Sequence, residues 1–280
     1  MGDVMKINAV FEGGGIKGLA YVGVMRFLEK RGFQIHKVGG TSVGSIFAAL
    51  IAAGYTSYEI EQLINDFNPN IITSMRGGRA SRIVSGIKQK GYYSIANFEK
   101  YLFSVLKDKK KIYFSDLKFG DQYLLKMIVT DWKKRKQVIL PDGLKAYGFD
   151  PDSFPISKAI AMSCSIPLFF RPYKIEDHVF FDGGVVNNFP ITLFQDDEVP
   201  TLGFRLSDSP LLKTKGLFQK YKKKVFKEEC DYDLEKFNII HIDTFGIKAT
   251  DFSKGLEKRL DLYISGYNSI RKYFYTHFNC

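Results

Sequence analysis

The chain has 280 residues, of which 45% are hydrophobic and 25% are charged, and this balance excludes an intrinsically disordered protein. A chain of this length buries enough apolar surface to fold without disulfide staples. Its cysteines, Cys164, Cys230 and Cys280, are widely spaced and form no C-x-x-C pair, which excludes a cysteine-clustered zinc site and favours a reducing compartment. The net charge of +11 suits an anionic partner such as a membrane surface or a nucleic acid.

Strand-like and helix-like segments alternate along the chain, and this alternation predicts an α/β protein with a largely parallel sheet covered on both faces. The expected strands are 7–11, 38–40, 123–130, 137–140, 179–181, 201–206 and 237–242. The expected helices are 19–30, 45–53, 58–66, 97–107, 157–163, 216–229 and 256–275. Residues 133–136 indicate a hairpin, so we expect a mixed sheet. No repeat, low-complexity tract or Pro/Ser-rich linker divides the chain, which predicts one domain over residues 1–280.

The sequence shows no targeting segment. Residues 1–6 are polar and carry a charge of each sign, unlike a signal peptide. The longest small and apolar run, 46–54, is too short to span a bilayer. We therefore expect a cytoplasmic protein that contacts a membrane only peripherally, if at all.

Gly40-Thr41-Ser42-Val43-Gly44 forms a G-x-S-x-G sequence between an expected strand and an expected buried helix. A serine at such a sharp turn has its hydroxyl lifted clear of the sheet, and the flanking glycines permit the crowded backbone. The N–H groups at the start of the helix also favour a developing negative charge. The pattern predicts a nucleophile at Ser42. The alternative is a glycine-rich turn with a helix-capping serine.

A second glycine-rich segment, Glu12-Gly13-Gly14-Gly15-Ile16-Lys17-Gly18, follows the first expected strand. Its G-x-G-x-x-G spacing resembles a dinucleotide site, but residues 34–38 lack the carboxylate expected about 20 positions further on. A Walker loop is excluded because Leu19-Ala20 stands where Lys and Ser or Thr are needed. The segment therefore predicts a nest of backbone N–H donors for an anion or an oxyanion. Lys17 adds positive charge there or is simply solvated.

A serine nucleophile needs a base, and one choice is a histidine triad. In the order typical of α/β-hydrolases the histidine comes last, which leaves His241 or His277. His241 lies within an expected strand and His277 near the C-terminal end. Structural or surface roles are therefore the more frequent expectation for both.

The other choice is Asp182, in the segment Phe180-Phe181-Asp182-Gly183-Gly184. It ends an apolar strand in a turn made by two glycines, where an aspartate is often only a turn residue. A free aspartate, with a pKa of about 3.9, is a poor base for a serine hydroxyl. Burial in a cleft would raise that pKa and make the carboxylate more useful.

Together these segments resemble the patatin-like phospholipase family, in which G-G-G-x-K-G, G-x-S-x-G and D-G-G follow one another in this order. Residues 161–167, Ala-Met-Ser-Cys-Ser-Ile-Pro, resemble that family's small-residue segment ending in proline. The resemblance covers about 7–206. More loosely, Asp243-Thr244 and Asp251-Phe252 are similar to the family's C-terminal portion. The resemblance implies a three-layer α/β/α fold with a mostly parallel central sheet. It also implies that the core motifs lie in 7–206 and that a C-terminal strand and helices lie in 207–280.

The resemblance also implies the roles of the site residues. Ser42 would form an acyl-enzyme, and Asp182 would be the sole base of a Ser-Asp dyad. The backbone of the glycine-rich segment would form the oxyanion hole, the nucleophile turn would need its two glycines, and the aspartate turn would need two more. The residues of the oxyanion hole would be Gly13, Gly14, Gly15, Lys17 and Gly18. The glycines of the nucleophile turn would be Gly40 and Gly44, and those of the aspartate turn would be Gly183 and Gly184.

Members of this family hydrolyse acyl esters of glycerophospholipids and related lipids without a metal or other cofactor. The sequence agrees, since it has no histidine cluster with zinc spacing and no EF-hand loop. The resemblance therefore implies a lipid acyl hydrolase of the phospholipase A type, with an acyl-lipid as substrate.

Two basic stretches are candidates for membrane contact. Residues 67–98 contain no acidic side chain but five basic ones, and their glycines suggest a flap over the site. Residues 217–227 have the pattern of a basic amphipathic helix, which can lie on an anionic interface or simply pack on the core. Nucleic-acid binding is not expected, because the basic residues match no recognised module.

Three other functions stay open at this stage. One is a non-catalytic lipid-binding or coat protein on the same fold, and another is a general serine esterase with a histidine-containing triad. A nucleotide-binding protein is the third. The sequence predicts no oligomeric state.

Overall fold

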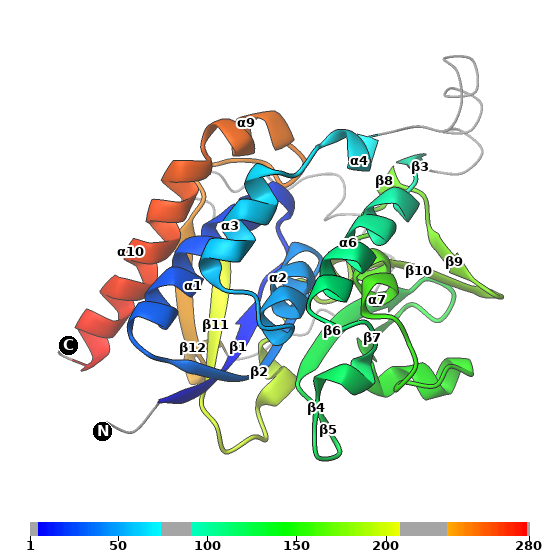
Figure 1. Cartoon of the computed structure of the whole chain (residues 1–280), viewed down its shortest axis with the longest axis horizontal. Coiled ribbons are helices and arrows are strands. Elements are labelled where there is room, and N and C mark those ends of the chain that lie inside the picture. The colour runs from blue at the N-terminus through cyan, green and yellow to red at the C-terminus, as the bar shows by residue number, and fades with distance from the viewer. Residues whose placement is uncertain (1–4, 74–90, 208–233, 279–280) are drawn as a thin grey trace.

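The structure, a computed structural model, describes residues 5–73, 91–207 and 234–278. An eight-stranded sheet crosses the molecule in the order β12-β11-β1-β2-β6-β10-β9, and β7 also pairs with β6 (Figure 1). Strands β12, β11, β1, β2 and β6 are parallel, whereas β7 and β10 run antiparallel to β6. The expected mixed, mostly parallel sheet with flanking helices is confirmed. The strands are β1 (Lys6–Phe11), β2 (Gln34–Thr41), β6 (Leu125–Asp131), β7 (Lys136–Leu140), β9 (Tyr173–Ile175), β10 (His178–Asp182), β11 (Thr201–Ser207) and β12 (Asn238–Asp243).

The helices of the described segments are α1 (Ala20–Lys30), α2 (Val43–Ala52), α3 (Ser57–Asn65), α4 (Asn70–Thr73), α6 (Ala96–Asp108), α7 (Ile156–Ser163), α9 (Phe252–Glu257) and α10 (Arg259–Phe278). Short 3-10 helices are η1 (Gly15–Leu19), η2 (Phe114–Leu117), η3 (Asp142–Tyr147), η4 (Gly183–Val185), η5 (Ile191–Phe194) and η6 (Leu234–Lys236). Two small sheets pair β3 (Gly91–Tyr93) with β8 (Leu168–Phe170) and β4 (Lys118–Phe119) with β5 (Gln122–Tyr123).

Several expected elements have different bounds in the structure. The helix expected over 19–30 follows a 3-10 turn, η1, and the helix expected over 256–275 is two helices, α9 and α10. The strand expected at 38–40 is longer, because β2 pairs with β1 from Gln34 onward. The helix expected at 216–229, the basic stretch 217–227 and the basic side chains between 74 and 90 lie outside the described residues.

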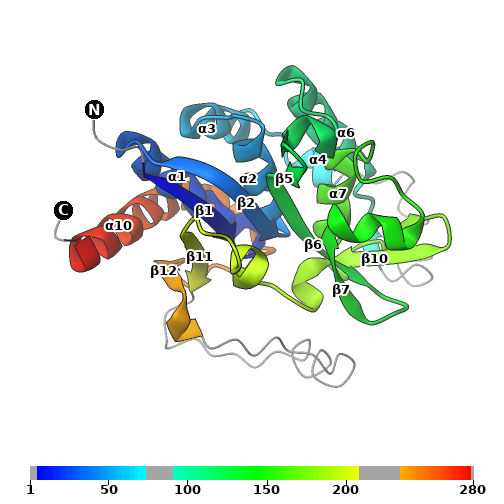
Figure 2. The ribbon, with the colours of Figure 1, turned by 90° about the horizontal axis from the view of Figure 1, so that it is seen from below.

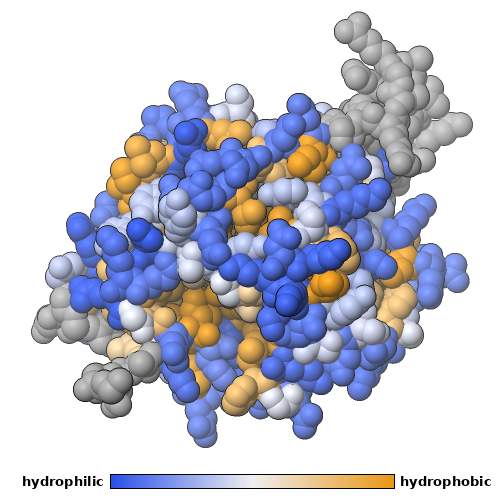
Figure 3. Space-filling view, viewed as in Figure 1, coloured by the Kyte–Doolittle hydropathy of each residue, from blue (hydrophilic) through white to orange (hydrophobic). Residues whose placement is uncertain are grey.

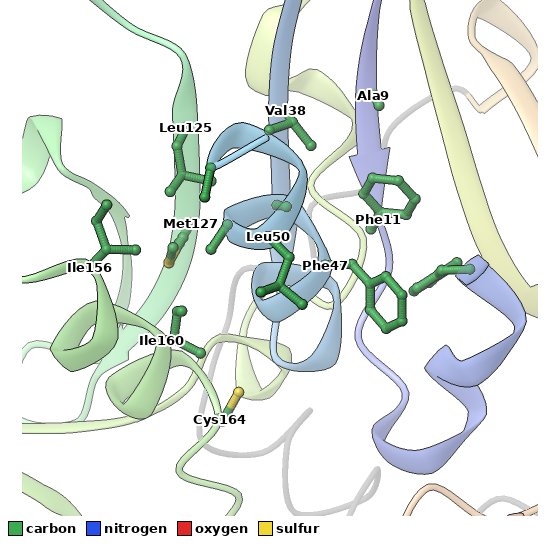
Figure 4. Close-up of a cluster of buried hydrophobic side chains, with 14 of the residues drawn as sticks. Ala9, Phe11, Val38, Phe47, Leu50, Leu125, Met127, Ile156, Ile160 and Cys164 are labelled. Carbon is green, nitrogen blue, oxygen red and sulfur yellow. The ribbon is translucent and has the colours of Figure 1, made fainter. Parts of the chain in front are cut away.

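The main hydrophobic core lies between the helices and one face of the sheet (Figure 2). Alternate β1 side chains, Ala9 and Phe11, belong to this core, whereas Val10 points to the opposite face and packs on residues 189–194. Helix α2 occupies the centre of the core, where Phe47 and Leu50 meet side chains of the sheet and of α7 (Figure 4). An expected helix without a polar face is therefore found in the interior, as its composition predicts.

On the face shown in Figure 3, hydrophobic side chains lie in groups among hydrophilic ones. Of the helices that the structure describes, none combines the length and the apolar character needed to cross a membrane.

Candidate active site

Ser42 and Asp182 lie where two strands meet end to end. β2 pairs in parallel with β6 and places Thr41 opposite Ile128, while β10 pairs antiparallel with β6 and places Asp182 opposite Val129. The other edge of β6 is occupied by β7 over the same residues. β2 and β10 therefore share one edge of β6 and run toward each other. Their carboxyl ends meet at neighbouring β6 residues, which brings together two residues far apart in the sequence.

Ser42 sits on a strained turn between β2 and α2. Its φ of 54° and ψ of −126° lie in a region that L-residues rarely adopt outside functional sites. Its side chain makes no capping hydrogen bond to α2, so the interpretation as a helix-capping serine is wrong. Its N–H donates to Oγ of Ser163 over 3.0 Å, and its carbonyl oxygen accepts from Oγ of Ser45 over 2.6 Å. The turn is thus held through its backbone, which leaves the hydroxyl for other partners.

Close backbone contacts explain the glycines of this turn. A Cβ at Gly40 would lie 2.5 Å from the carbonyl oxygen of Gly44, and one at Gly44 would lie 2.3 Å from the carbonyl oxygen of Phe11. A Cβ at Gly18 would lie 2.5 Å from a methyl group of Val43. The start of α2 therefore packs directly on the end of β1 and on η1.

Asp182 is buried, with 5% of its surface exposed. Its Oδ1 accepts from the Gly184 N–H over 2.7 Å, and the Ser42 side chain also interacts with its carboxylate. Burial raises the pKa of Asp182 to about 6, although Ser42 and the Gly184 N–H both lower it. The expected rise of this pKa is confirmed, and it makes the carboxylate a stronger base while leaving it largely ionised at neutral pH. A Cβ at Gly183 would lie 2.3 Å from the Ile128 carbonyl oxygen, so this turn is also closely packed.

The glycine-rich segment 12–18 lies against the serine turn. A Cβ at Gly13 would lie 3.2 Å from Cβ of Ser42. The Gly13 N–H already donates to the carbonyl oxygen of Asn188 over 2.9 Å, so it is not a free donor for an oxyanion. The N–H groups of Gly14 and Gly15 have no hydrogen-bond partner among the described residues. Of the N–H groups expected to form the oxyanion hole, those of Gly14 and Gly15 are therefore the candidates. Gly18 is buried in η1, and Lys17 is half-buried beside it.

An apolar cavity of about 180 Å³ opens at Ser42. Helix α2 forms one wall with Val43, Ile46, Phe47 and Leu50, and α3, α6 and α9 supply further apolar side chains. The thiol of Cys164 also lines the cavity; burial and the charge of Asp182 raise its pKa. A cavity of this kind accepts a hydrocarbon chain and excludes charged groups.

The chain is similar to known proteins over most of its length. The model of the patatin-like phospholipase family matches residues 9–194. This chain belongs to the patatin-like phospholipase family. It is 35% identical over 277 residues to the uncharacterized protein YqhO of Bacillus subtilis, covering 92% of this chain and 94% of that protein.

The chain is also similar to more distant proteins. The chain is 26% identical over 255 residues to "Probable lipid hydrolase 463L" of Invertebrate iridescent virus 6, covering 89% of this chain and 82% of that protein. The crystal structure of VipD from Legionella pneumophila matches with a TM-score of 0.61 at 18% identity, covering 97% of this chain and 67% of that chain. At that identity the structural match shows the fold alone.

The two histidines considered for a triad bond to other groups in this patatin-like chain. Nδ1 of His241, on the edge strand β12, lies 2.8 Å from Oγ of Ser207. Nδ1 of His277, in α10, lies 2.8 Å from the Tyr273 carbonyl oxygen. Among the described residues, no group of three or more His, Cys, Asp and Glu side chains is arranged to hold a metal ion.

Three polar residues around the site were not assigned roles from the sequence. Ser163 accepts from the Ser42 N–H, Thr130 donates its hydroxyl to the Asp182 carbonyl oxygen over 2.9 Å, and Asn188 bonds to Gly13. Ser163 lies in the small-residue segment that contributes to the family resemblance, and Asn188 follows the aspartate turn closely. These two positions are the only signals of a role that the sequence contains for the three residues. Their contacts could not be predicted, because they join segments that are far apart in the sequence.

Proposed function

We propose that this protein is a lipid acyl hydrolase of the phospholipase A type, which cleaves fatty-acyl esters of glycerophospholipids with a Ser42–Asp182 dyad. The observation that carries the proposal is the placement of Ser42, which lines an apolar cavity, beside the buried Asp182 carboxylate of raised pKa. A serine paired with a base of raised pKa is the arrangement that nucleophilic catalysis needs. The cavity supplies a place for one acyl chain.

In the first half of the reaction, Oγ of Ser42 attacks the ester carbonyl carbon while Asp182 takes the hydroxyl proton. The negative charge on the carbonyl oxygen is stabilised by the N–H groups of Gly14 and Gly15, which are available for this role. Aligned donors of this kind contribute about 3–4 kcal/mol each to transition-state stabilisation. The tetrahedral intermediate collapses as Asp182 returns the proton to the leaving alcohol, and the acyl group stays on Ser42.

In the second half, Asp182 takes a proton from water, whose oxygen attacks the acyl-enzyme carbonyl carbon. The same two N–H groups receive the new oxyanion. Collapse breaks the bond to Oγ of Ser42, which regains its proton from Asp182, and the fatty acid leaves. Each proton taken by Asp182 is thus returned within the same half-reaction.

The proposed partner is a phospholipid or another acyl-lipid at an anionic membrane surface. The net charge of +11 supports peripheral contact, since each basic residue near such a surface contributes about 1 kcal/mol. No recognised nucleic-acid module favours a nucleic acid as partner.

The decisive experiment measures fatty-acid release from phosphatidylcholine and phosphatidylglycerol vesicles in the presence of a chelator. We expect Ser42→Ala and Asp182→Asn to lose about 10²-fold or more of the wild-type rate. Asp131→Asn is the matched control: Asp131, on β6, is also a buried aspartate, but its carboxylate accepts from the Tyr147 hydroxyl and the Lys134 backbone N–H instead.

The outcomes separate the competing functions. Release by the wild type and by Asp131→Asn, but not by the two site variants, supports the dyad. Retained release by Asp182→Asn together with loss in His241→Ala would overturn the dyad in favour of a histidine triad. Vesicle binding without release by any variant would favour the non-catalytic lipid-binding function.

A further inference from the structure

Asn188 bonds to the glycine-rich segment through both its backbone and its side chain. Its carbonyl oxygen accepts from the Gly13 N–H over 2.9 Å, and its Nδ2 donates to the Gly13 carbonyl oxygen over 3.0 Å. A Cβ at Gly13 would lie 2.5 Å from Oδ1 of Asn188, and one at Gly184 would lie 2.6 Å from the same atom. Asn188 is therefore packed between the glycine-rich segment and the aspartate turn, and it fixes Gly13 by two hydrogen bonds.

Glu12 is the second member of this network. Its Oε1 accepts from Nδ2 of Asn188 over 3.3 Å, and its Oε2 accepts from the Leu206 N–H over 2.6 Å. The carboxylate is thus tied to β11 on one side and to Asn188 on the other. Both oxygens accept hydrogen bonds, so the ionised form of Glu12 satisfies both contacts.

The surroundings of Glu12 make this carboxylate costly to keep. Its side chain is 11% exposed, and Nε of Arg205 lies 3.8 Å from Oε1. Lys17 and Tyr21 are the other titratable groups that interact with it. Burial raises the pKa of Glu12 to about 7, and Arg205 is the leading influence that lowers it. A buried carboxyl group lowers the free energy of unfolding unless hydrogen bonds or a paired charge offset its loss of hydration.

We infer that Glu12 and Asn188 are positioning residues, which hold Gly13 so that the next N–H groups, of Gly14 and Gly15, stay directed at the substrate oxyanion. This inference rests on the proposed function for its catalytic meaning, but the holding of the segment is a property of the folded chain. With Gly13 bonded through both its N–H and its carbonyl oxygen, the peptide groups that follow start from a fixed position. Preorganised donors are effective because they need no reorientation during the reaction.

The test compares Asn188→Asp with a matched control, Asn8→Asp. Nδ2 of Asn8 also donates to a carboxylate, Asp197, over 3.2 Å and to a backbone carbonyl, that of Val199, over 3.1 Å. Asn8 lies in the middle of β1, opposite Thr201 at the start of β11, whereas the site lies beyond the carboxyl end of β1. Each substitution replaces a donor by an acceptor in a similar setting, so a general loss of stability affects both variants.

Two readouts are measured, both at pH 8. One is kcat and KM for p-nitrophenyl butyrate, and the other is hydrogen exchange of the Gly13, Gly14 and Gly15 amides. We expect Asn188→Asp to lower kcat about 10²-fold with KM changed less than about threefold, and to speed exchange of these amides. Asn8→Asp should leave kcat and these amides close to the wild type. Should Asn188→Asp not fold, Glu12→Gln replaces it, because its amide would face the N–H donors of Asn188 and Leu206.

Each outcome bears on the inference. Equal changes in kcat and in exchange for the variants at positions 8 and 188 would overturn it, because they would show only a structural role. A loss of kcat with unchanged exchange would also overturn it. If the wild type hydrolyses no ester, the proposed function is overturned, while the exchange comparison still decides whether Asn188 holds the segment.

Discussion

The backbone N–H of Ser42 donates to Oγ of Ser163 over 3.0 Å, and that hydroxyl donates in turn to the Ile128 carbonyl oxygen over 2.7 Å. One buried serine thus connects the nucleophile turn, the end of α7 and strand β6. It supports the backbone of Ser42, so it contributes to the site as a positioning residue.

Ser163→Ala should therefore weaken the turn. The change leaves a buried N–H and a buried carbonyl oxygen without their partner, and an unsatisfied buried group costs about 1–3 kcal/mol of unfolding free energy. Urea unfolding measures the loss. Ser165→Ala is the control, since its hydroxyl donates to the Ala161 carbonyl oxygen, four residues earlier in the chain, and has no other partner among the described residues. An equal loss in both variants would contradict the role given to Ser163.

Asp182→Asn should remove activity yet stabilise the fold above pH 6. The pKa of Asp182 is raised from 3.8 to about 6 in the folded protein, so the folded state binds the proton more tightly than the unfolded state. Stability is therefore lost as the pH rises through this interval, by about 3 kcal/mol when the loss is complete. The neutral amide avoids this loss. Thermal unfolding at pH 4 and pH 8 should show a gain for the variant at pH 8 only, and a gain of equal size at both values would disagree with the raised pKa.

Ser42→Gly should be more stable than Ser42→Ala, although neither variant can act as a nucleophile. The φ of 54° and ψ of −126° at this position strain any residue with a Cβ by about 1–3 kcal/mol. At an ordinary position the order is reversed, because glycine is then less stable than alanine by about 0.5–1 kcal/mol. Chemical unfolding of the two variants measures the difference directly, and a less stable glycine variant would argue against strain in this turn.

Leu50→Phe should shorten the acyl chain that the site accepts. Leu50 and Ser42 both line the cavity, and a helical rise of 1.5 Å per residue places Leu50 about 12 Å along α2 from Ser42. A larger side chain there should lower kcat/KM for p-nitrophenyl decanoate about tenfold and leave the butyrate rate unchanged. The butyrate ester is the internal control. A parallel fall for both esters would indicate a distorted site, and no change for either would mean that the chain does not enter this cavity.

The sequence predicted the alternating elements and the mixed sheet. These predictions succeeded because local patterns carry them: strand-like and helix-like segments alternate along the chain, and α2 is apolar on every side. The roles given to the site residues stay a prediction. The raised pKa of Asp182 was also predictable, since a carboxylate at the end of an apolar strand becomes buried. The extent of the domain over 1–280 stays a prediction.

What the sequence could not predict depends on contacts between distant segments. The Gly13 N–H donates to the Asn188 carbonyl oxygen and is therefore not free to bind an oxyanion. No local sequence pattern predicts this hydrogen bond. The strands β3 and β8 are only three residues long, too short for a periodicity to be recognised. The start of the first helix as a 3-10 turn likewise follows from the packing of η1 on α2 and α9.

Because β2 and β10 converge on one edge of β6, that strand sets the spacing between the serine turn and the aspartate turn. Thr41, the residue before Ser42, pairs with Ile128, and Asp182 pairs with Val129; these two β6 residues are one step apart, or about 3.3 Å. A residue inserted between them would leave both strands paired but would separate Ser42 from Asp182 by that step. The geometry of the site thus depends on a strand that contributes no reacting group. Engineered versions of this fold would need to keep the number of β6 residues between the two pairing positions.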